Sequence, residues 1–175
     1  MIAIIAEKPS VGLDIARVVG ADTRNDGYCS GNGYMVTWAL GHLVSLAMPD
    51  TYGYTKTAAE DLPMLPDPFR LISRQMRTDR GMVTDIAASK QLKVIESVFN
   101  RCDSIIVATD AGREGELIFR WIYAFLECTK PFRRLWISSL TDEAIRKGLE
   151  ELKDGSEYDS LYAAADSRAK ADWLG

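Results

Sequence analysis

The sequence predicts an α/β fold in which a mainly parallel central sheet is flanked by helices and carries an added β-hairpin. Three observations lead to this prediction. Short apolar runs end at polar residues, stretches with apolar residues at helical spacing follow them, and a glycine-rich turn joins two segments of alternating polarity. Strands that alternate with helices form right-handed βαβ units, and the resulting parallel sheet is covered on both faces.

The first expected elements are a strand, a tight turn and a helix. Residues 2–6 form an apolar run that is rich in isoleucine. The apolar residues after this run recur at helical spacing: Val11, Ile15, Val18 and Val19. Pro9 near the start of this stretch and Gly20 just after it are typical of the two ends of a helix.

A β-hairpin and an irregular segment are expected next. Two alternating segments, around Tyr28 and over residues 34–40, are joined through Gly-Asn-Gly at 31–33, whose residues tolerate the positive φ of hairpin turns. Residues 49–68 carry four prolines, and this composition predicts an irregular excursion between regular elements.

A helix and a second strand follow the irregular segment. The helical stripe consists of Val83, Ile86, Ala87, Val94, Ile95 and Val98. The strand is the apolar run at residues 105–108, which ends at Thr109 and Asp110. The sequence therefore places a carboxylate directly after a strand.

The last third of the chain predicts one more strand and three helices. Residues 117–125 carry a strong helical stripe, and residues 135–137 are a third strand candidate. A helix opens at Thr141, which can accept a hydrogen bond from the first turn as an N-cap. The Ala-rich tail, residues 161–175, is helical in propensity.

The basic residues are concentrated in one stretch. Residues 66–101 carry seven Lys and Arg against four Asp and Glu, whereas the whole chain has a net charge of −4. Four arginines in this stretch would share one face if the segment were helical: Arg70, Arg74, Arg77 and Arg80. Two interpretations stay open, a solvated basic face and a track for the DNA backbone.

The composition excludes several classes of protein. The 175 residues are 47% apolar and 26% charged, which is typical of a globular domain and not of a disordered chain or a disulfide scaffold. No apolar run approaches the roughly 20 residues of a membrane helix, and no basic leader precedes the first strand, so we expect a cytosolic protein. Cys29, Cys102 and Cys128, with His42 as the only histidine, form no ordinary zinc motif, so we expect buried thiols.

Acidic residues gather where the predicted strands end. Ligands of parallel sheets bind beyond the carboxyl ends of the strands, and this rule selects Glu7, Lys8 and the run 110–116. Clustered carboxylates raise one another's pKa unless a cation neutralises them. Mg²⁺ suits such a site, because it binds few carboxylates and leaves positions open for phosphate oxygens. The alternative is that Glu114 and Glu116 only complement the dipole of the helix they open.

Five segments along nearly the whole chain carry a family resemblance. In their order, they resemble the Toprim domain of type IA DNA topoisomerases, specifically the topoisomerase III branch: IAEKPS, WALGHL, ATDAGREGELIFR, WISSLTDEAI and SRAKADWLG. The resemblance implies the Toprim fold, which is a Rossmann-like α/β fold. It further implies that residues 1–155 form this domain and that residues 156–175 begin the following helical DNA-binding domain.

The resemblance implies roles for individual residues. Glu7 matches the glutamate that hands a proton to the 3′ oxygen leaving the scissile phosphate, and Lys8 matches the lysine that balances charge on that phosphate. Asp110 and Glu114 match the first and last members of the family's Asp-x-Asp-x-Glu magnesium motif. Gly112 replaces the middle aspartate, so either water fills that coordination position or the metal is held more weakly.

The remaining candidates are phosphate or DNA contacts. Arg113 and His42 fit family positions near the site, and a purely structural role is the alternative for each. Arg168, Lys170 and Asp172 match the start of the next domain, where contacts to single-stranded DNA are expected.

The resemblance implies an isomerase that cuts one DNA strand through a 5′-phosphotyrosine link, passes another strand and reseals the cut. The family's nucleophile lies in a later domain in a Tyr-x-Arg context, and none of the seven tyrosines here has an arginine two residues on. We therefore expect a monomeric N-terminal fragment that is inactive alone and acts on single-stranded DNA within a full-length enzyme of the bacterial cytoplasm, near the nucleoid. The alternatives are a primase- or nuclease-like Toprim phosphotransferase and a receiver-like signalling module that is phosphorylated on Asp110.

Overall fold

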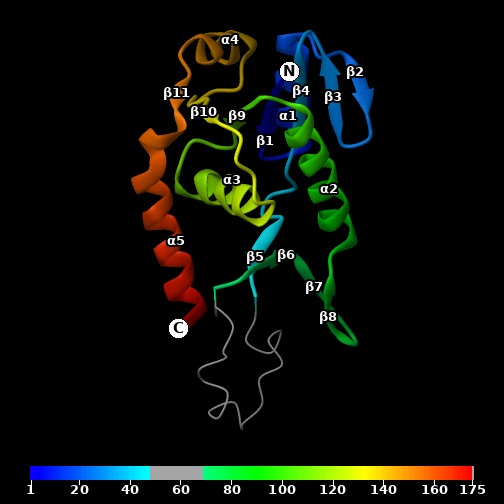
Figure 1. The fold of residues 1–175 in the computed structure, drawn as a ribbon, viewed down its shortest axis with the longest axis vertical. Coiled ribbons are helices and arrows are strands. Elements are labelled where there is room, and N and C mark those ends of the chain that lie inside the picture. The colour runs from blue at the N-terminus through cyan, green and yellow to red at the C-terminus, as the bar shows by residue number, and fades with distance from the viewer. Residues whose placement is uncertain (48–68, 175) are drawn as a thin grey trace.

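The fold is built on one seven-stranded sheet. The computed structural model describes residues 1–47 and 69–174 (Figure 1). The strand order is β11-β10-β9-β1-β4-β3-β2. The four central strands pair in parallel: β10 (Phe132–Arg134), β9 (Ser104–Ala108), β1 (Ile2–Ala6) and β4 (Tyr34–Trp38). The predicted mainly parallel α/β sheet is therefore confirmed.

Antiparallel strands extend the sheet at both edges. The predicted hairpin is confirmed as β3 (Tyr28–Gly31) paired with β4, and β2 (Thr23–Asn25) pairs with β3. Asn32 in the hairpin turn has a φ of 53°, as the Gly-Asn-Gly sequence led us to expect. At the other edge, β11 (Lys153–Asp154) pairs with β10.

Helices cover both faces of the sheet. One face packs against α2 (Ile86–Arg101) and α3 (Arg113–Phe125), and the other face packs against α1 (Pro9–Val19) and α4 (Asp142–Glu150). After a short 3₁₀ helix, η3 (Gly155–Tyr158), the tail forms α5 (Asp159–Leu174), which lies alongside α3 (Figure 1). Thr141 caps α4 by accepting a hydrogen bond from the Ala144 N–H at 3.2 Å, as predicted.

Two hydrophobic cores, one on each face of the sheet, explain why the strand sequences are continuously apolar. Ala3 and Ile5 of β1 belong to the core under α2 and α3, whereas Ile4 and Ala6 belong to the core under α1 and α4. A strand that is buried on both faces has no polar alternation. Cys29 and Cys102 are buried free thiols, as expected, and Cys128 is half-buried.

Residues 70–80 do not form a helix, so the condition under which their four arginines would share one helix face is not met. The chain forms two small antiparallel pairs here, β5 (Val44–Leu46) with β6 (Leu71–Ser73) and β7 (Gln75–Thr78) with β8 (Gly81–Thr84). Val83 therefore lies in β8, outside the helix that its spacing had predicted. The helix starts later because Asp85 caps it, accepting a hydrogen bond from the Ala88 N–H at 3.3 Å.

The strand expected at residues 135–137 lies earlier in the chain, as β10 (Phe132–Arg134), so this prediction was wrong. β10 contains Arg134, a charged residue that is fully buried in the sheet, and this charge hid the strand in the sequence. The predicted irregular excursion at 49–68 lies outside the described residues. In the part of the chain that the structure describes, no helix has the length and apolar character to span a membrane.

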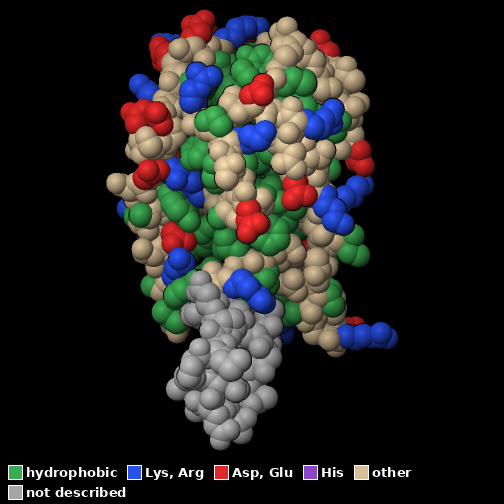
Figure 2. Space-filling model, viewed as in Figure 1, with side chains coloured by type: hydrophobic (Ala, Val, Ile, Leu, Met, Phe, Trp, Pro, Cys, Tyr) green, Lys and Arg blue, Asp and Glu red, His purple; other side chains and the backbone are tan. Residues whose placement is uncertain are grey.

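Figure 2 shows acidic and basic side chains interspersed over the face of the molecule that Figure 1 presents. The charged side chains on this face therefore do not form one block of a single sign. Any contact with an anion on this face depends on local groups and not on the overall charge.

We predict that Ile4→Ala lowers the free energy of unfolding by about 2–5 kcal/mol, because it leaves a cavity in the centre of the sheet. Ile4 is 0% exposed, whereas Ile86 at the start of α2 is 79% exposed. The control Ile86→Ala should stay within about 0.5 kcal/mol of the unmodified chain. Urea unfolding followed by circular dichroism measures both, and equal losses would contradict the assigned core.

Candidate active site at the carboxyl ends of β1 and β9

The central sheet has a topological switch point between β1 and β9. From β1 the chain passes through α1 to strands on one side of the sheet, whereas β9 lies on the other side of β1. Ligand sites of open α/β sheets lie in the crevice at such a point, beyond the carboxyl ends of the strands. Glu7 directly follows β1 and Asp110 follows β9, so both predicted residues lie at this crevice.

Glu7 and Asp110 are in direct contact. The Asp110 N–H donates a hydrogen bond to Glu7 Oε1 at 3.0 Å. Burial raises the pKa of Glu7, and the charge of Asp110 raises it further, while the hydrogen bond from the Asp110 N–H opposes both. Glu7 is therefore a carboxyl group that holds a proton more readily than a free glutamate does.

The chain between Asp110 and α3 depends on two glycines. Gly112 is the N-cap of α3 and has a φ of 155°, a backbone region that is essentially restricted to glycine. A Cβ atom at Gly115 would lie 1.8 Å from the Asp110 carbonyl oxygen. The Thr109 hydroxyl donates to the Gly115 carbonyl oxygen at 2.8 Å and ties the strand end to the first turn of α3. The departure from the family motif at Gly112 thus coincides with a backbone requirement.

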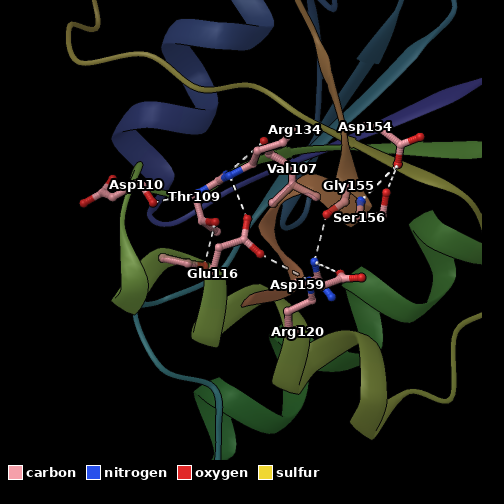
Figure 3. Close-up of polar contacts among 11 residues, drawn as sticks. Val107, Thr109, Asp110, Glu116, Arg120, Arg134, Asp154, Gly155, Ser156 and Asp159 are labelled. Atoms are coloured by element: carbon pink, nitrogen blue, oxygen red, sulfur yellow. Dashed lines mark hydrogen bonds and ion pairs between the residues drawn. The ribbon is translucent and has the colours of Figure 1, made fainter. Parts of the chain in front are cut away.

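Glu116 is not available as a metal ligand, because it is buried in an ion-pair network (Figure 3). Its carboxylate oxygens lie 2.9 Å from Arg134 Nε and 3.2 Å from Arg120 Nε. Burial raises the pKa of Glu116 and lowers the pKa of Arg134, and the opposite charges counteract both shifts. The interpretation that Glu116 only complements the helix dipole is therefore incomplete, because its main contacts are the ion pairs with Arg134 and Arg120.

Glu114 lies at the first turn of α3 and pairs with His42 Nε2. The loop that carries His42 is held by Arg74, whose Nη1 donates to the carbonyl oxygens of Leu40 at 2.7 Å and His42 at 2.9 Å. The contact between two residues 72 positions apart could not be read from the sequence.

A cavity of about 450 Å³ gathers most of the predicted DNA contacts. His42, Arg113, Glu114, Arg168 and Asp172 all line it. The last two come from α5, which Trp121 of α3 anchors through a 2.9 Å hydrogen bond from its indole N–H to Asp166. Lys170 does not line this cavity, and its ammonium pairs with Asp166 at 2.9 Å.

The donor set at Asp110 fits a hard cation with few protein ligands. Among the described residues, no group of three or more His, Cys, Asp or Glu is arranged to hold a metal ion. Glu7 and Asp110 are adjacent, whereas Glu114 is engaged by His42. Asp110 also borders a second cavity of about 720 Å³, between the end of β10 and α4. Mg²⁺ is commonly bound through one or two carboxylates with water and phosphate oxygens, so this arrangement suits it.

Sequence reasoning missed Arg134 and Arg120, which hold Glu116. The spacing of Glu116 and Arg120, four residues apart on one helix, is typical of an ion pair and could have indicated half of the network. Lys8 is exposed at the N-cap of α1, directly after Glu7, as its place in the sequence led us to expect.

Comparison with known proteins finds a family and relatives. The family model described as "Toprim domain" matches residues 2–140. DNA topoisomerase 3 of Shouchella clausii is 49% identical over 98% of this chain and 22% of its own length. DNA topoisomerase 3 of Bacillus subtilis is 46% identical over 98% of this chain and 23% of its own length. The chain thus spans less than a quarter of the length of these relatives.

One solved structure supports the fold alone. The full-length topoisomerase I from Thermotoga maritima superposes with a TM-score of 0.52 over 87% of this chain and 21% of that chain, at 16% sequence identity. These comparisons confirm the resemblance that the five sequence segments indicated.

We predict that Gly115→Ala lowers the free energy of unfolding by about 1–3 kcal/mol, although alanine is the better helix former. The new Cβ would meet the backbone oxygen of Asp110, which cannot move without shifting the loop. In the helical control Gly148→Ala, the new Cβ meets side-chain atoms of Leu135 and Ile137 and no backbone atom, so its loss should be smaller. Thermal unfolding compares the two, and an unchanged Gly115→Ala would contradict the close packing at Asp110.

Proposed function

Because this chain belongs to the Toprim domain family, we propose that it supplies the magnesium-binding and proton-transfer groups with which a type IA DNA topoisomerase cleaves and rejoins one DNA strand. The observation that carries this proposal is the contact of Glu7 with Asp110 at the switch point of the sheet. The names of the relatives, which are 46–49% identical over nearly all of this chain, favour a topoisomerase over a primase-like, nuclease-like or receiver-like protein.

Glu7 is the proposed acid and base. In cleavage, the 3′ oxygen that leaves the scissile phosphate takes a proton from the Glu7 carboxyl group, and in religation the 3′ hydroxyl returns it. A general acid works best when its pKa lies near the working pH, so the raised pKa of Glu7 supports this role. Lys8, the next residue, would balance the charge of the phosphate.

Asp110, with Glu7 beside it and Glu114 on the first turn of α3, would hold the cation. When bound, Mg²⁺ neutralises phosphate oxygens and stabilises the charge that develops on them. The contact between Glu114 and His42 keeps the Glu114 carboxylate close to the 450 Å³ cavity, so His42 would orient this ligand.

The 450 Å³ cavity is the proposed contact with single-stranded DNA. Arg113 and Arg168 would bind phosphate oxygens, and Asp172 and His42 would accept or donate hydrogen bonds at bases or sugars. Lys170 would act at the edge of this surface. These local cations explain how a chain with a net charge of −4 can contact DNA.

The proposed reaction also concerns the domain boundaries, the source of the nucleophile and the location of the protein. We assign residues 1–155 to the Toprim domain and residues 156–175 to the start of a helical DNA-binding domain, with α5 as its first helix. The nucleophilic tyrosine would come from outside this chain. We further propose that the protein is a monomer and acts in the bacterial cytoplasm, in contact with the nucleoid.

We predict that Asp110→Asn weakens Mg²⁺ binding at least about tenfold, because a carboxylate attracts a dication by several kcal/mol in a partly desolvated site. Isothermal titration of the isolated chain at fixed salt measures this. The control is Asp103→Asn, whose side chain is 92% exposed and which precedes β9, at the opposite end of this strand from Asp110. Equal affinities of the two variants would refute a magnesium site at Asp110.

We predict that Glu7→Gln slows DNA cleavage and religation about 10²- to 10⁴-fold, the usual contribution of a general acid or base. The assay requires the whole enzyme, so the chain replaces the matching 175 residues of the Bacillus subtilis DNA topoisomerase 3. The control Glu143→Gln alters an exposed acid on α4 and should leave the rates unchanged. Near-normal rates with Glu7→Gln would remove this residue from the mechanism.

The isolated 175 residues should neither relax supercoiled DNA nor form a covalent DNA adduct. Positioned carboxylates cannot begin the transesterification without the nucleophile. Gel assays for relaxation, and for adducts that survive denaturation, test this with the chimaeric enzyme as the positive control. An adduct formed by the purified chain alone would show that one of its own tyrosines is the nucleophile.

A further inference from the structure

Arg134 is a buried cation next to the proposed active site. It is the largest fully buried side chain of the described residues, at 1% exposure, and it lies at the end of β10. Its guanidinium lies beside Val107 of β9 and Glu116 (Figure 3). Nη1 donates to the Val107 carbonyl oxygen at 3.0 Å, and Nη2 donates to the Asp110 carbonyl oxygen at 2.7 Å.

Stability alone does not account for this arrangement. Removing a guanidinium from water is costly, and a buried ion pair often stabilises a fold no better than apolar residues of the same size. Glu116 lies 2.9 Å from Arg134 and neutralises its charge. Apolar side chains of the same size would fill this part of the core equally well. What the pair adds is a planar donor with fixed direction, aimed at two backbone carbonyls.

The backbone on both sides of Asp110 is thereby fixed. Its N–H donates to Glu7 and its carbonyl oxygen accepts from Arg134. Gly115 leaves room at the same carbonyl, where a Cβ would collide. Since both peptide groups that flank the Asp110 Cα are held, the direction of its Cα–Cβ bond is held as well.

Arg120 provides an internal comparison. It pairs with the same Glu116 at 3.2 Å, yet its Nη2 donates to the Gly155 carbonyl oxygen at 2.9 Å and to Asp159 at 2.8 Å. Arg120 therefore braces η3 and α5, whereas Arg134 braces the strand end that carries Asp110.

We propose that Arg134 is a positioning residue, which acts through the Asp110 carbonyl group to aim the Asp110 carboxylate at Glu7 and at the bound cation. Glu116 serves this role by holding the guanidinium in place. That the carboxylate is directed at a cation rests on the proposed function. The hold of Arg134 on the Asp110 carbonyl group, which we call the clamp, is a property of the chain without metal.

Backbone amide NMR of the metal-free chain tests the clamp. Arg134→Gln removes the charge-assisted bond to Asp110, so hydrogen exchange at the Asp110 amide should accelerate at least about tenfold more than in Arg120→Gln. Each rate is compared at the same free energy of unfolding, set with urea. Arg134→Lys keeps the charge, can reach one carbonyl, and should give an intermediate rate. This variant also decides the matter if Arg134→Gln does not fold.

Magnesium titration of the same variants tests the consequence. Arg134→Gln should weaken Mg²⁺ binding about 10- to 100-fold, and Arg120→Gln should change it little. Equal exchange at Asp110 in the Arg134 and Arg120 variants would overturn the positioning role, whatever the metal does. If Asp110→Asn binds Mg²⁺ as tightly as the unmodified chain, the proposed function fails instead, and the exchange rates still decide the clamp.

Discussion

Two hydrogen bonds, from the Asp110 N–H to Glu7 and from Arg134 to the Asp110 carbonyl oxygen, set the geometry of the candidate site. They depend on the register of the sheet. β1 and β9 pair in parallel with Ala6 beside Ala108, so the residues after the two strands emerge side by side. The two carboxylates are therefore neighbours because the sheet places them so, and their mutual repulsion is offset by the stability of the core beneath them.

The sheet tolerates the repulsion between the two carboxylates because helices pack against both of its faces. Successive residues of β1 enter alternate cores, one under α2 and α3 and the other under α1 and α4. The site itself is polar and half-exposed, so the apolar strands fix its position while the first turn of α3 remains close to solvent. Gly112 and Gly115 allow that turn to approach the strand end, which relates the departure from the family's acidic motif to backbone geometry.

The sequence predicted the parts of the fold that depend on local pattern. Apolar runs, the Gly-Asn-Gly turn and Thr141 each determine a strand, a hairpin or a helix start from neighbouring residues alone. Predictions failed where a contact between residues far apart in the sequence determines the local structure. The strand at 132–134 contains Arg134, whose charge only Glu116 in α3 makes tolerable, and the arginines at 70–80 lie around short strands whose pairing their spacing cannot show. Glu7 and Asp110 were found through the strand-end rule, but the pairing of Glu114 with His42 was not.

The proposed function requires that a dication binds beside Glu7 and Asp110. Mn²⁺ prefers the same oxygen ligands as Mg²⁺, and its unpaired electrons broaden NMR signals of nearby amides. In a titration of the labelled chain with substoichiometric Mn²⁺, the amide signals of Glu7, Asp110 and Ala111 should broaden before those of other acidic surface residues. Earlier broadening at Asp14 and Asp142, a pair of exposed acids that share Arg17, would contradict the account.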